Sequence, residues 1–141
     1  MLGFRIKRDT ATTGLPMLSE ETDTRFEIRN STIAGAGRGL FAKVPLEEGS
    51  RLEIIGIFIV SGSIADECTR YADIYKFRVG DYLLIPAGYG GMVNHSAQPN
   101  IAKIIAKQRV YLQTLRPIAA GEELFFRYSD FAVAQMAGKT P

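Results

Sequence analysis

Short apolar runs separated by glycine and proline turns dominate the chain from residue 26 onward, a pattern typical of many short β-strands. Alternation and β-branched composition predict strands over the following ranges: 26–29, 39–43, 52–60, 75–79, 82–86, 101–106, 109–115 and 123–128. The two-residue connections Gly80-Asp81 and Lys107-Gln108 predict hairpins between neighbouring strands. The Ile- and Val-rich run 52–60 predicts a strand buried on both faces.

One segment changes from strand-like alternation to helical spacing. Its small, apolar and aromatic positions share one face of a helix and are 64, 65, 68, 71, 72 and 75. Ser63, with Asp66 three residues later, resembles a capping box in which Asp takes the place of Glu. Residues 87–100 are rich in glycine, proline and polar side chains, which predicts a loop. The predicted fold class is therefore mostly β with one helix.

The length of 141 residues suits one compact domain, and 46% hydrophobic with 23% charged residues is enough to bury a core. Residues 1–24 are rich in Thr, Glu and Asp without a sustained period. They predict a partly flexible N-terminal arm with a short strand at 4–7. The compact domain is expected over 25–131, followed by a C-terminal tail over 132–141.

Composition and charge disfavour several function classes. The 17 basic and 15 acidic residues are scattered and leave a net charge of +2, so no direct nucleic-acid binding is expected. Cys68 is the single cysteine, so the chain cannot form an internal disulfide or a cysteine-based zinc site. The chain lacks a signal-peptide-like stretch and any apolar run near the roughly 20 residues of a membrane span. We therefore expect an intracellular protein that does not bind membranes.

Three segments are candidates for chemistry, and the first is the turn 35–39. Its three glycines permit positive φ angles and let a ligand approach the backbone closely. A dinucleotide fingerprint requires G-x-G-x-x-G between a strand and a helix. Here the third glycine, Gly39, comes too early and a strand-like run follows it. A tight structural turn is therefore the alternative.

The second segment, 94–100, contains the single histidine of the chain, His95. A lone histidine is either a hydrogen-bonded structural residue or a functional one. No second His or Cys stands near it in the sequence, which disfavours a zinc or iron site. Ser96 does not pair with His95 as a hydrolase nucleophile and base, because adjacent residues of an extended loop point away from each other.

The third segment, 121–128, places Leu124, Phe126 and Tyr128 on one face of a predicted strand. Such an aromatic and apolar face ordinarily packs into the core. The alternative is an aromatic-walled channel around a cation, because aromatic rings attract ammonium and sulfonium groups through their π faces.

Together these segments resemble the SET-domain protein-lysine methyltransferase family. The resemblance extends over about 26–131 and depends on three motifs in the family's order: G-A-G-R-G-L-F-A at 35–42, V-N-H-S followed by P-N at 93–100, and G-E-E-L-x-F-x-Y at 121–128. It implies small curved β-sheets, a C-terminal pseudoknot and a short helical insert. It also implies transfer of a methyl group from S-adenosylmethionine to a lysine side chain of a protein.

The resemblance assigns one set of residues to S-adenosylmethionine: Ala36, Gly37, Arg38, Asn94, His95, Tyr128 and Phe131. Tyr128 matches the catalytic tyrosine, and its hydroxyl is expected to orient the substrate nitrogen. Methyl transfer to an amine is an in-line displacement, so alignment supplies much of the rate. The lysine must first lose a proton from a normal pKa of about 10.4. His95 is implied to be a positioning residue and not a general base.

A second set is implied to contact the substrate lysine and consists of Tyr75 and Phe126. Phenylalanine at 126, where family members carry Phe or Tyr, leaves space for additional methyl groups and implies di- or trimethylation. The larger nuclear members carry a zinc-binding cysteine where this chain has Ala97, together with a cysteine-rich segment after the domain. This chain has neither, so no metal is expected, and it is similar to the minimal SET proteins of viruses and bacteria.

The expected partner is a protein or peptide with an accessible lysine, and histone, ribosomal and nucleoid proteins all stay open. A homodimer is a further candidate, because the lysine channel needs a cover from either the C-terminal residues or a second subunit. The expected location is cytoplasmic for a bacterial protein, and the nucleus is open to a viral or eukaryotic one. Two alternatives remain: a non-catalytic SET-like module that binds peptide or cofactor, and a methyltransferase acting on a small amine or nucleic acid.

Overall fold

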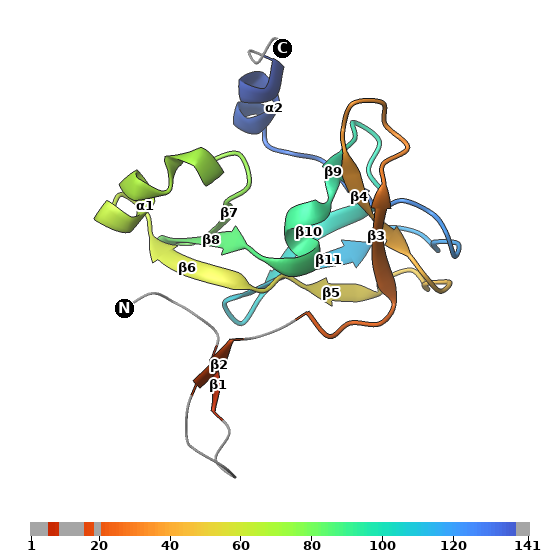
Figure 1. Cartoon of the computed structure of the whole chain (residues 1–141), viewed down its shortest axis with the longest axis horizontal. Helices are drawn as coiled ribbons and strands as arrows, with labels where there is room; N and C mark the ends of the chain where they lie inside the picture. Colours follow the sequence, from red (N-terminus) through yellow and green to blue (C-terminus); the bar gives the residue numbers. More distant parts are fainter. Residues whose placement is uncertain (1–5, 9–15, 19–20, 138–141) are drawn as a thin grey trace.

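The computed structural model of the protein describes residues 6–8, 16–18 and 21–137 (Figure 1). Its strands form several small sheets, which confirms the predicted fold class. The antiparallel sheets are β1 (Ile6–Arg8) with β2 (Pro16–Leu18); β3 (Phe26–Asn30) with β4 (Arg38–Ala42); β6 (Gly56–Val60), β8 (Tyr82–Pro86) and β7 (Phe77–Val79); and β10 (Ile101–Ala106), β11 (Arg109–Thr114) and β5 (Arg51–Glu53).

One parallel pair and four helical segments complete the described part of the chain. The parallel strands are β9 (Asn94–His95) and β12 (Phe125–Phe126). The helices are α1 (Ile64–Cys68) and α2 (Asp130–Ala137), with 3₁₀ turns at Arg70–Ala72 and Gly88–Met92. None of the described helices is long and apolar enough to cross a membrane.

Both hairpins form where the two-residue connections predicted them. β7 and β8 join through Gly80, whose φ is 59°. β10 and β11 join through Lys107 and Gln108, whose φ angles are 50° and 62°. Two successive positive φ angles match the twist of a two-residue hairpin, although neither residue is a glycine. The strand predicted at 4–7 overlaps β1, and its first two residues lie outside the described residues.

The run 52–60 does not form the single strand that its composition predicts. It divides at Ile54 and Ile55 into β5 and β6, which belong to different sheets. A Cβ at Gly56 would lie 2.0 Å from the carbonyl oxygen of Ile85. The predicted strand was therefore too long. Gly56 begins β6 and, having no Cβ, lets this strand approach β8 closely at the point where the chain passes from one sheet to the next.

The predicted cap of α1 is confirmed. The Asp66 N–H donates to the Ser63 hydroxyl at 3.3 Å, and the Gly62 N–H donates to the Asp66 carboxylate at 2.8 Å. The helix is shorter than predicted, since Thr69 leaves helical geometry at φ −113° and ψ 27° and a 3₁₀ turn follows. The helix signal thus identified the element and its start but not its end.

Neither helix buries a broad apolar face. Ile64 and Tyr71 belong to the predicted apolar face of the insert, yet they are 82% and 80% exposed. The pattern did not predict α2, which begins before residue 132 and buries only Ala132. Figure 1 shows both helices at the edge of the molecule, outside the packed sheets.

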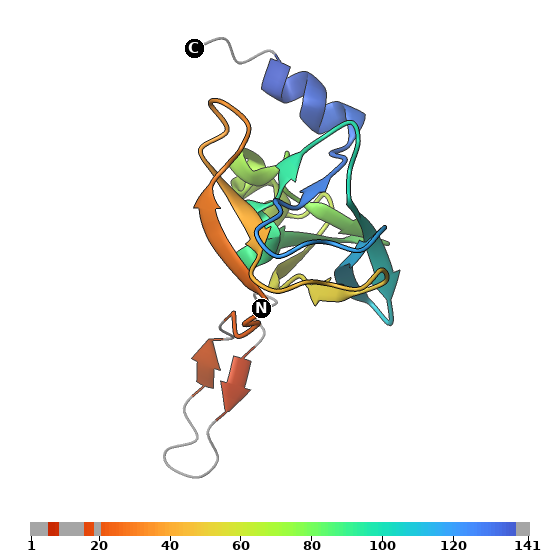
Figure 2. The same ribbon diagram turned by 90° about the vertical axis from the view of Figure 1, so that its right-hand side faces the viewer.

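The hydrophobic core lies where the small sheets meet (Figure 2). It is built from side chains of several strands and of the segments between them: Phe26, Leu40, Ala42, Leu46, Leu52, Ile54, Phe77, Val79, Leu84, Val93, Ile101, Val110, Leu112, Ile118 and Leu124. Burial of each large aliphatic side chain is worth about 1.5–3 kcal/mol. Since no sheet among the described residues has more than three strands, the sheets of the core are stabilised mainly by packing against one another.

The C-terminal segment 121–128 lies between two segments that are distant in sequence. On one edge, the Ala42 N–H donates to the Glu122 carbonyl at 3.0 Å and the Leu124 N–H donates to the Leu40 carbonyl at 2.8 Å. On the other edge, β12 pairs with β9, and the Asn100 N–H donates to the Phe125 carbonyl at 3.1 Å. This two-sided pairing is the arrangement expected of the predicted pseudoknot.

Glu123 is a buried carboxylate at the centre of this arrangement, with 4% of its surface exposed. Its Oε1 accepts the N–H and the hydroxyl of Thr32, both at 2.7 Å. Its Oε2 accepts the Ser31 hydroxyl at 2.8 Å and the Asn94 amide at 3.2 Å. A Cβ at Gly39 would lie 2.3 Å from the same Oε2. The third glycine of the 35–39 turn therefore makes room for this carboxylate.

Burial by itself acts to raise the pKa of Glu123, but the hydrogen bonds from Thr32, Ser31 and Asn94 outweigh it and hold the pKa below 4.5. A carboxyl whose pKa is lowered on folding stabilises the fold above its unfolded pKa. That contribution is lost as the pH falls through the folded pKa.

We predict that Glu123→Gln reduces the free energy of unfolding by roughly 1–3 kcal/mol at neutral pH, because buried donors lose a charged acceptor. Below about pH 4.5 the difference in the free energy of unfolding between the variant and the wild type should narrow, because Glu123 of the wild type then becomes protonated and the variant has no such group. Denaturant unfolding across this pH range measures both effects. The exposed Glu48→Gln is the matched control. Equal pH dependence of wild type and Glu123→Gln would contradict the prediction.

Candidate active site

Tyr128 ends the C-terminal segment in a cluster of aromatic rings. Its ring centroid lies 4.9 Å from that of Phe126 and 5.3 Å from that of His95, and Phe126 lies 5.5 Å from Phe77. Only 9% of Tyr128 is exposed. The short strand β12 brings Phe126 and Tyr128 to the same side, because residues two apart in extended chain share a face.

Hydrogen bonds fix Tyr128 at both its backbone and its side chain. Its hydroxyl donates to the Val93 carbonyl at 2.7 Å, and its backbone N–H donates to Nδ1 of His95 at 2.9 Å. Burial, and then the neighbouring Tyr75, raise the pKa of Tyr128 to about 12. The phenol is therefore protonated at neutral pH. Its proton is committed to Val93, which leaves the oxygen lone pairs as acceptors.

Two cavities adjoin this aromatic cluster, and both are lined by Tyr75, Phe77, Phe126 and Tyr128. The larger has a volume of about 310 Å³ and extends along Ile101, Ala102, Lys103, Arg127 and other neighbours. The smaller has a volume of about 10 Å³ and extends towards Pro86, Gly90, Gly91 and Val93. The smaller cavity has room for about one water molecule, and its aromatic walls suit a compact cationic group such as an ammonium.

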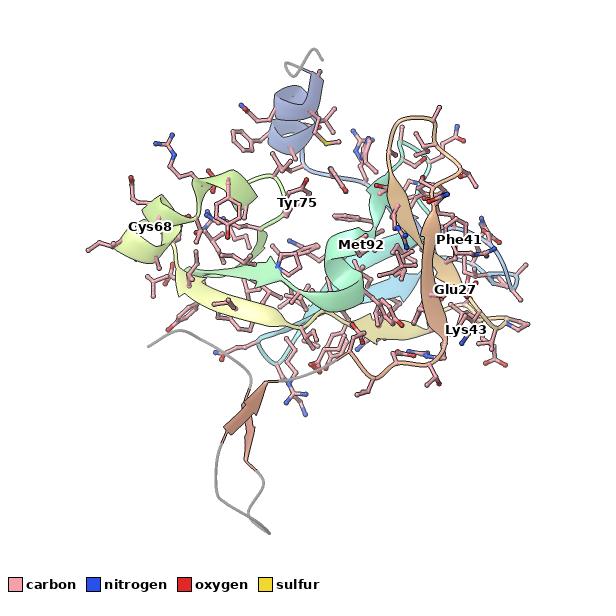
Figure 3. The ribbon with its side chains drawn as sticks, in the orientation of Figure 1. Glu27, Phe41, Lys43, Cys68, Tyr75 and Met92 are labelled. Carbon is pink, nitrogen blue, oxygen red and sulfur yellow. The ribbon has the colours of Figure 1, made fainter. Side chains whose placement is uncertain are left out.

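Tyr75 reaches these cavities from the segment between α1 and β7 (Figure 3). The next residue, Lys76, is held by two carboxylates of the same insert: Asp66 at 2.7 Å and Asp73 at 2.6 Å. Burial acts to lower the pKa of Lys76, but the hydrogen bonds to these carboxylates raise it above 10.5. With 4% of its side chain exposed, Lys76 anchors the segment that carries Tyr75.

Asn94 and the 35–39 turn form a second side of the site. The Asn94 amide nitrogen donates to the Arg38 carbonyl at 3.0 Å as well as to Glu123. Its Oδ1 accepts no hydrogen bond from any described residue, so it can accept one from a ligand ammonium. Gly37 has a φ of 74° and open space where a Cβ would stand, so its backbone is accessible. These groups fit the amino-acid end of S-adenosylmethionine.

The structure brings most of the predicted site residues together, but not all of them. Asn94 and Arg38 are joined by a hydrogen bond, His95 contacts Tyr128, and Tyr75, Phe126 and Tyr128 line the same cavities. The Ala36 N–H donates to the Ile33 carbonyl at 3.2 Å, and Ala36 forms no hydrogen bond with another predicted site residue among the described residues. Phe131 is 55% exposed on α2 and has no ring contact with another described aromatic residue.

Three supporting residues were not identified from the sequence: Glu123, Val93 and Lys76. Alternation along 123–128 places Glu123 on the opposite face of the strand from the buried Leu124. In an isolated strand that face would be exposed to solvent. Glu123 is buried because β4 covers that side. The Val93 carbonyl carries no side-chain signal, and Lys76 resembles an ordinary exposed charge between two aromatic residues. The two aspartates of the same insert, Asp66 and Asp73, were the sequence feature that could have indicated a buried ion pair with Lys76.

Comparisons with known proteins agree with this geometry. The SET domain family matches residues 37–129. Histone-lysine N-methyltransferase Su(var)3-9 of Drosophila melanogaster is 33% identical over 119 residues, which cover 69% of this chain and 19% of that protein.

Two solved structures have the same fold over most of the chain. A humanized mutant of the Chaetomium thermophilum polycomb repressive complex 2, bound to the inhibitor GSK126, aligns with a TM-score of 0.64 and 27% identity over 74% of this chain and 15% of that one. ctPRC2 in an autoinhibited conformation, bound to S-adenosylmethionine, aligns with a TM-score of 0.63 and 25% identity. The alignment covers 80% of this chain and 16% of that chain. This chain spans less than a fifth of the length of these relatives. With the family match covering 37–129, the chain belongs to the SET domain family.

Proposed function

We propose that the chain is a protein-lysine N-methyltransferase that transfers a methyl group from S-adenosylmethionine to a lysine side chain of a protein. The observation that carries this proposal is the buried phenol of Tyr128, whose proton is committed to Val93 beside a narrow aromatic cavity. Membership of the SET domain family and similarity to a histone-lysine N-methyltransferase support it.

The residues proposed to hold S-adenosylmethionine lie on the side of the site formed by the 35–39 turn and β9. The backbone of Ala36, Gly37 and Arg38 and the free Oδ1 of Asn94 would bind its amino-acid end. The backbone of His95 would meet the adenine, and Phe131 is an additional candidate for covering it. When bound, S-adenosylmethionine supplies a methyl group activated by a sulfonium charge.

Tyr128 is proposed to hold the acceptor lysine in line for attack. Because its O–H donates to Val93, the phenol oxygen can accept a hydrogen bond from the lysine nitrogen. Phe126, Phe77 and Tyr75 exclude water around that nitrogen. Burial of an amine lowers its pKa, so the same walls favour the neutral, nucleophilic form. Holding the reacting atoms in a fixed alignment then supplies much of the rate.

The proposed substrate is a protein with an accessible lysine. The relative from Drosophila melanogaster is named for histone lysine, and a histone or histone-like protein is accordingly the first class to test. A second copy of this chain as a cover for the lysine channel remains a proposal, as does an intracellular, cytoplasmic or nuclear location.

We predict that Tyr128→Phe lowers the rate of methyl transfer by about a hundredfold or more, because it removes the acceptor that aligns the lysine nitrogen. Labelled S-adenosylmethionine, mixed basic proteins and mass spectrometry measure transfer and locate the modified residue. Tyr71→Phe is the matched control, since Tyr71 is 80% exposed and lines neither cavity. Cofactor binding without transfer to any protein would instead favour the non-catalytic module.

We predict that Phe126→Tyr shifts the product towards monomethyl-lysine, because the added hydroxyl occupies space in the narrow cavity that a methylated nitrogen needs. Mass spectrometry of a methylated peptide gives the proportions of mono-, di- and trimethyl-lysine. Phe58→Tyr is the control, since Phe58 is half-buried on β6 and lines neither of these cavities. An unchanged product distribution would contradict a role for Phe126 in setting product state.

A further inference from the structure

The larger cavity beside Tyr128 has an unbalanced charge. Its walls come from residues 74–77, 99, 101–103 and 126–129, and its volume of about 310 Å³ exceeds what one lysine side chain occupies. The ionisable groups in its lining, apart from the two tyrosines, are Lys76, Lys103 and Arg127, and none of the described carboxylates lines it. Residues of a substrate next to the acceptor lysine would therefore meet cationic walls.

Lys76 does not contribute a free charge to this cavity. Its ammonium contacts the carboxylates of Asp66 and Asp73 at 2.7 and 2.6 Å, and its side chain is 4% exposed. Two carboxylates so close neutralise the cation and satisfy its donors.

Lys103 has no such partner among the described residues. Burial, and then the nearby charge of Arg78, lower the pKa of Lys103 below 10.5. Within the described part of the chain, Arg78 donates to the neutral oxygens of Gly80 and Ser61 at 3.4 Å, and it interacts with the Asp66 carboxylate only through longer-range electrostatics. Lys103 is exposed and lines the cavity, so its ammonium is open to an incoming anion, which would also offset the repulsion from Arg78.

Arg127 is only weakly neutralised. Its nearest carboxylate is that of Asp130 at 3.8 Å, and the Asp130 side chain is 98% exposed. An exposed pair at this separation contributes little and leaves the guanidinium free to exchange partners. Arg127 directly precedes Tyr128, so its charge stands at the end of the segment that carries the phenol.

We propose that this cavity selects substrates with an acidic residue next to the acceptor lysine, and that Lys103 and Arg127 recognise that residue. The inference rests on the proposed function, because it treats the cavity as the place where substrate residues flanking the lysine bind. Opposite charges at an interface contribute mainly to the choice of partner, and the same two cations repel substrates with basic residues at these positions.

The test uses the full chain loaded with S-adenosylhomocysteine and three fluorescent peptides that carry one lysine flanked by Glu, by Gln or by Lys. Fluorescence anisotropy should show the Glu-flanked peptide binding roughly three- to tenfold more tightly than the Lys-flanked one, with the Gln-flanked peptide between them. This difference should shrink in about 0.5 M salt, which screens exposed charges.

Charge reversal at the two positions provides the second arm. The order of affinities should reverse in the double variant Lys103→Glu with Arg127→Glu. Each single variant should weaken the preference. Lys43→Glu is the matched control for net charge, because Lys43 lies on the other side of the molecule from Tyr75 (Figure 3) and should keep the wild-type order.

Equal affinities for the three peptides, tighter binding of the Lys-flanked peptide, or binding of none of them would overturn the inference. Incubating the same peptides with the protein and S-adenosylmethionine distinguishes failure of the selectivity from failure of the proposed function. Methylation without preference would reject only the selectivity. Selective binding without any methylation would reject the methyltransferase function and leave the selectivity of the cavity standing.

Discussion

The buried carboxylate of Glu123 connects three segments on which the site depends. Its oxygens accept hydrogen bonds from Ser31 and Thr32, which follow β3, and from Asn94 on β9. Asn94 in turn donates to the Arg38 carbonyl at the start of β4. An ionised carboxylate can be buried only when such donors compensate its lost hydration. The position of β12, and with it that of Tyr128, is therefore coupled to the turn proposed to bind the cofactor.

The backbone strengthens this coupling because the C-terminal segment is paired on both edges. Its partners around residues 40–42 are some 80 positions away in the sequence, while those at 94–100 are much nearer. Bringing the distant partner into contact carries a larger loop-closure cost. Pairing of β12 with β9 brings Tyr128 next to His95, because Tyr128 follows β12 and His95 belongs to β9. Assembly of the aromatic cluster therefore depends on contacts between segments that are distant in the sequence.

Sequence reasoning was most successful where the determining interactions are local. The Lys107-Gln108 hairpin and the Ser63 cap need only neighbouring residues, and both were predicted correctly. The break at Ile54 and Ile55 depends on how β6 meets β8, which no local pattern contains. Hydrophobic alternation likewise gave no indication that Glu123 is buried. The proximity of Asn94, His95 and Tyr128 was expected only through the family resemblance, because residue spacing along a chain does not determine distances in space.

The insert between β6 and β7 forms its strongest polar contacts within itself. Asp66, Asp73 and Lys76 all belong to it. Within its 3₁₀ turn, Arg70–Ala72, Ala72 is the buried residue. Such a segment can diverge in evolution as a unit, since a change in its length or sequence leaves the Glu123 network untouched. One wall of the larger cavity comes from this insert, whereas Asn94 and Gly37 lie outside it. The wall that carries Tyr75 could therefore be exchanged as a module, while the selectivity proposed for Lys103 and Arg127 stays with the constant scaffold.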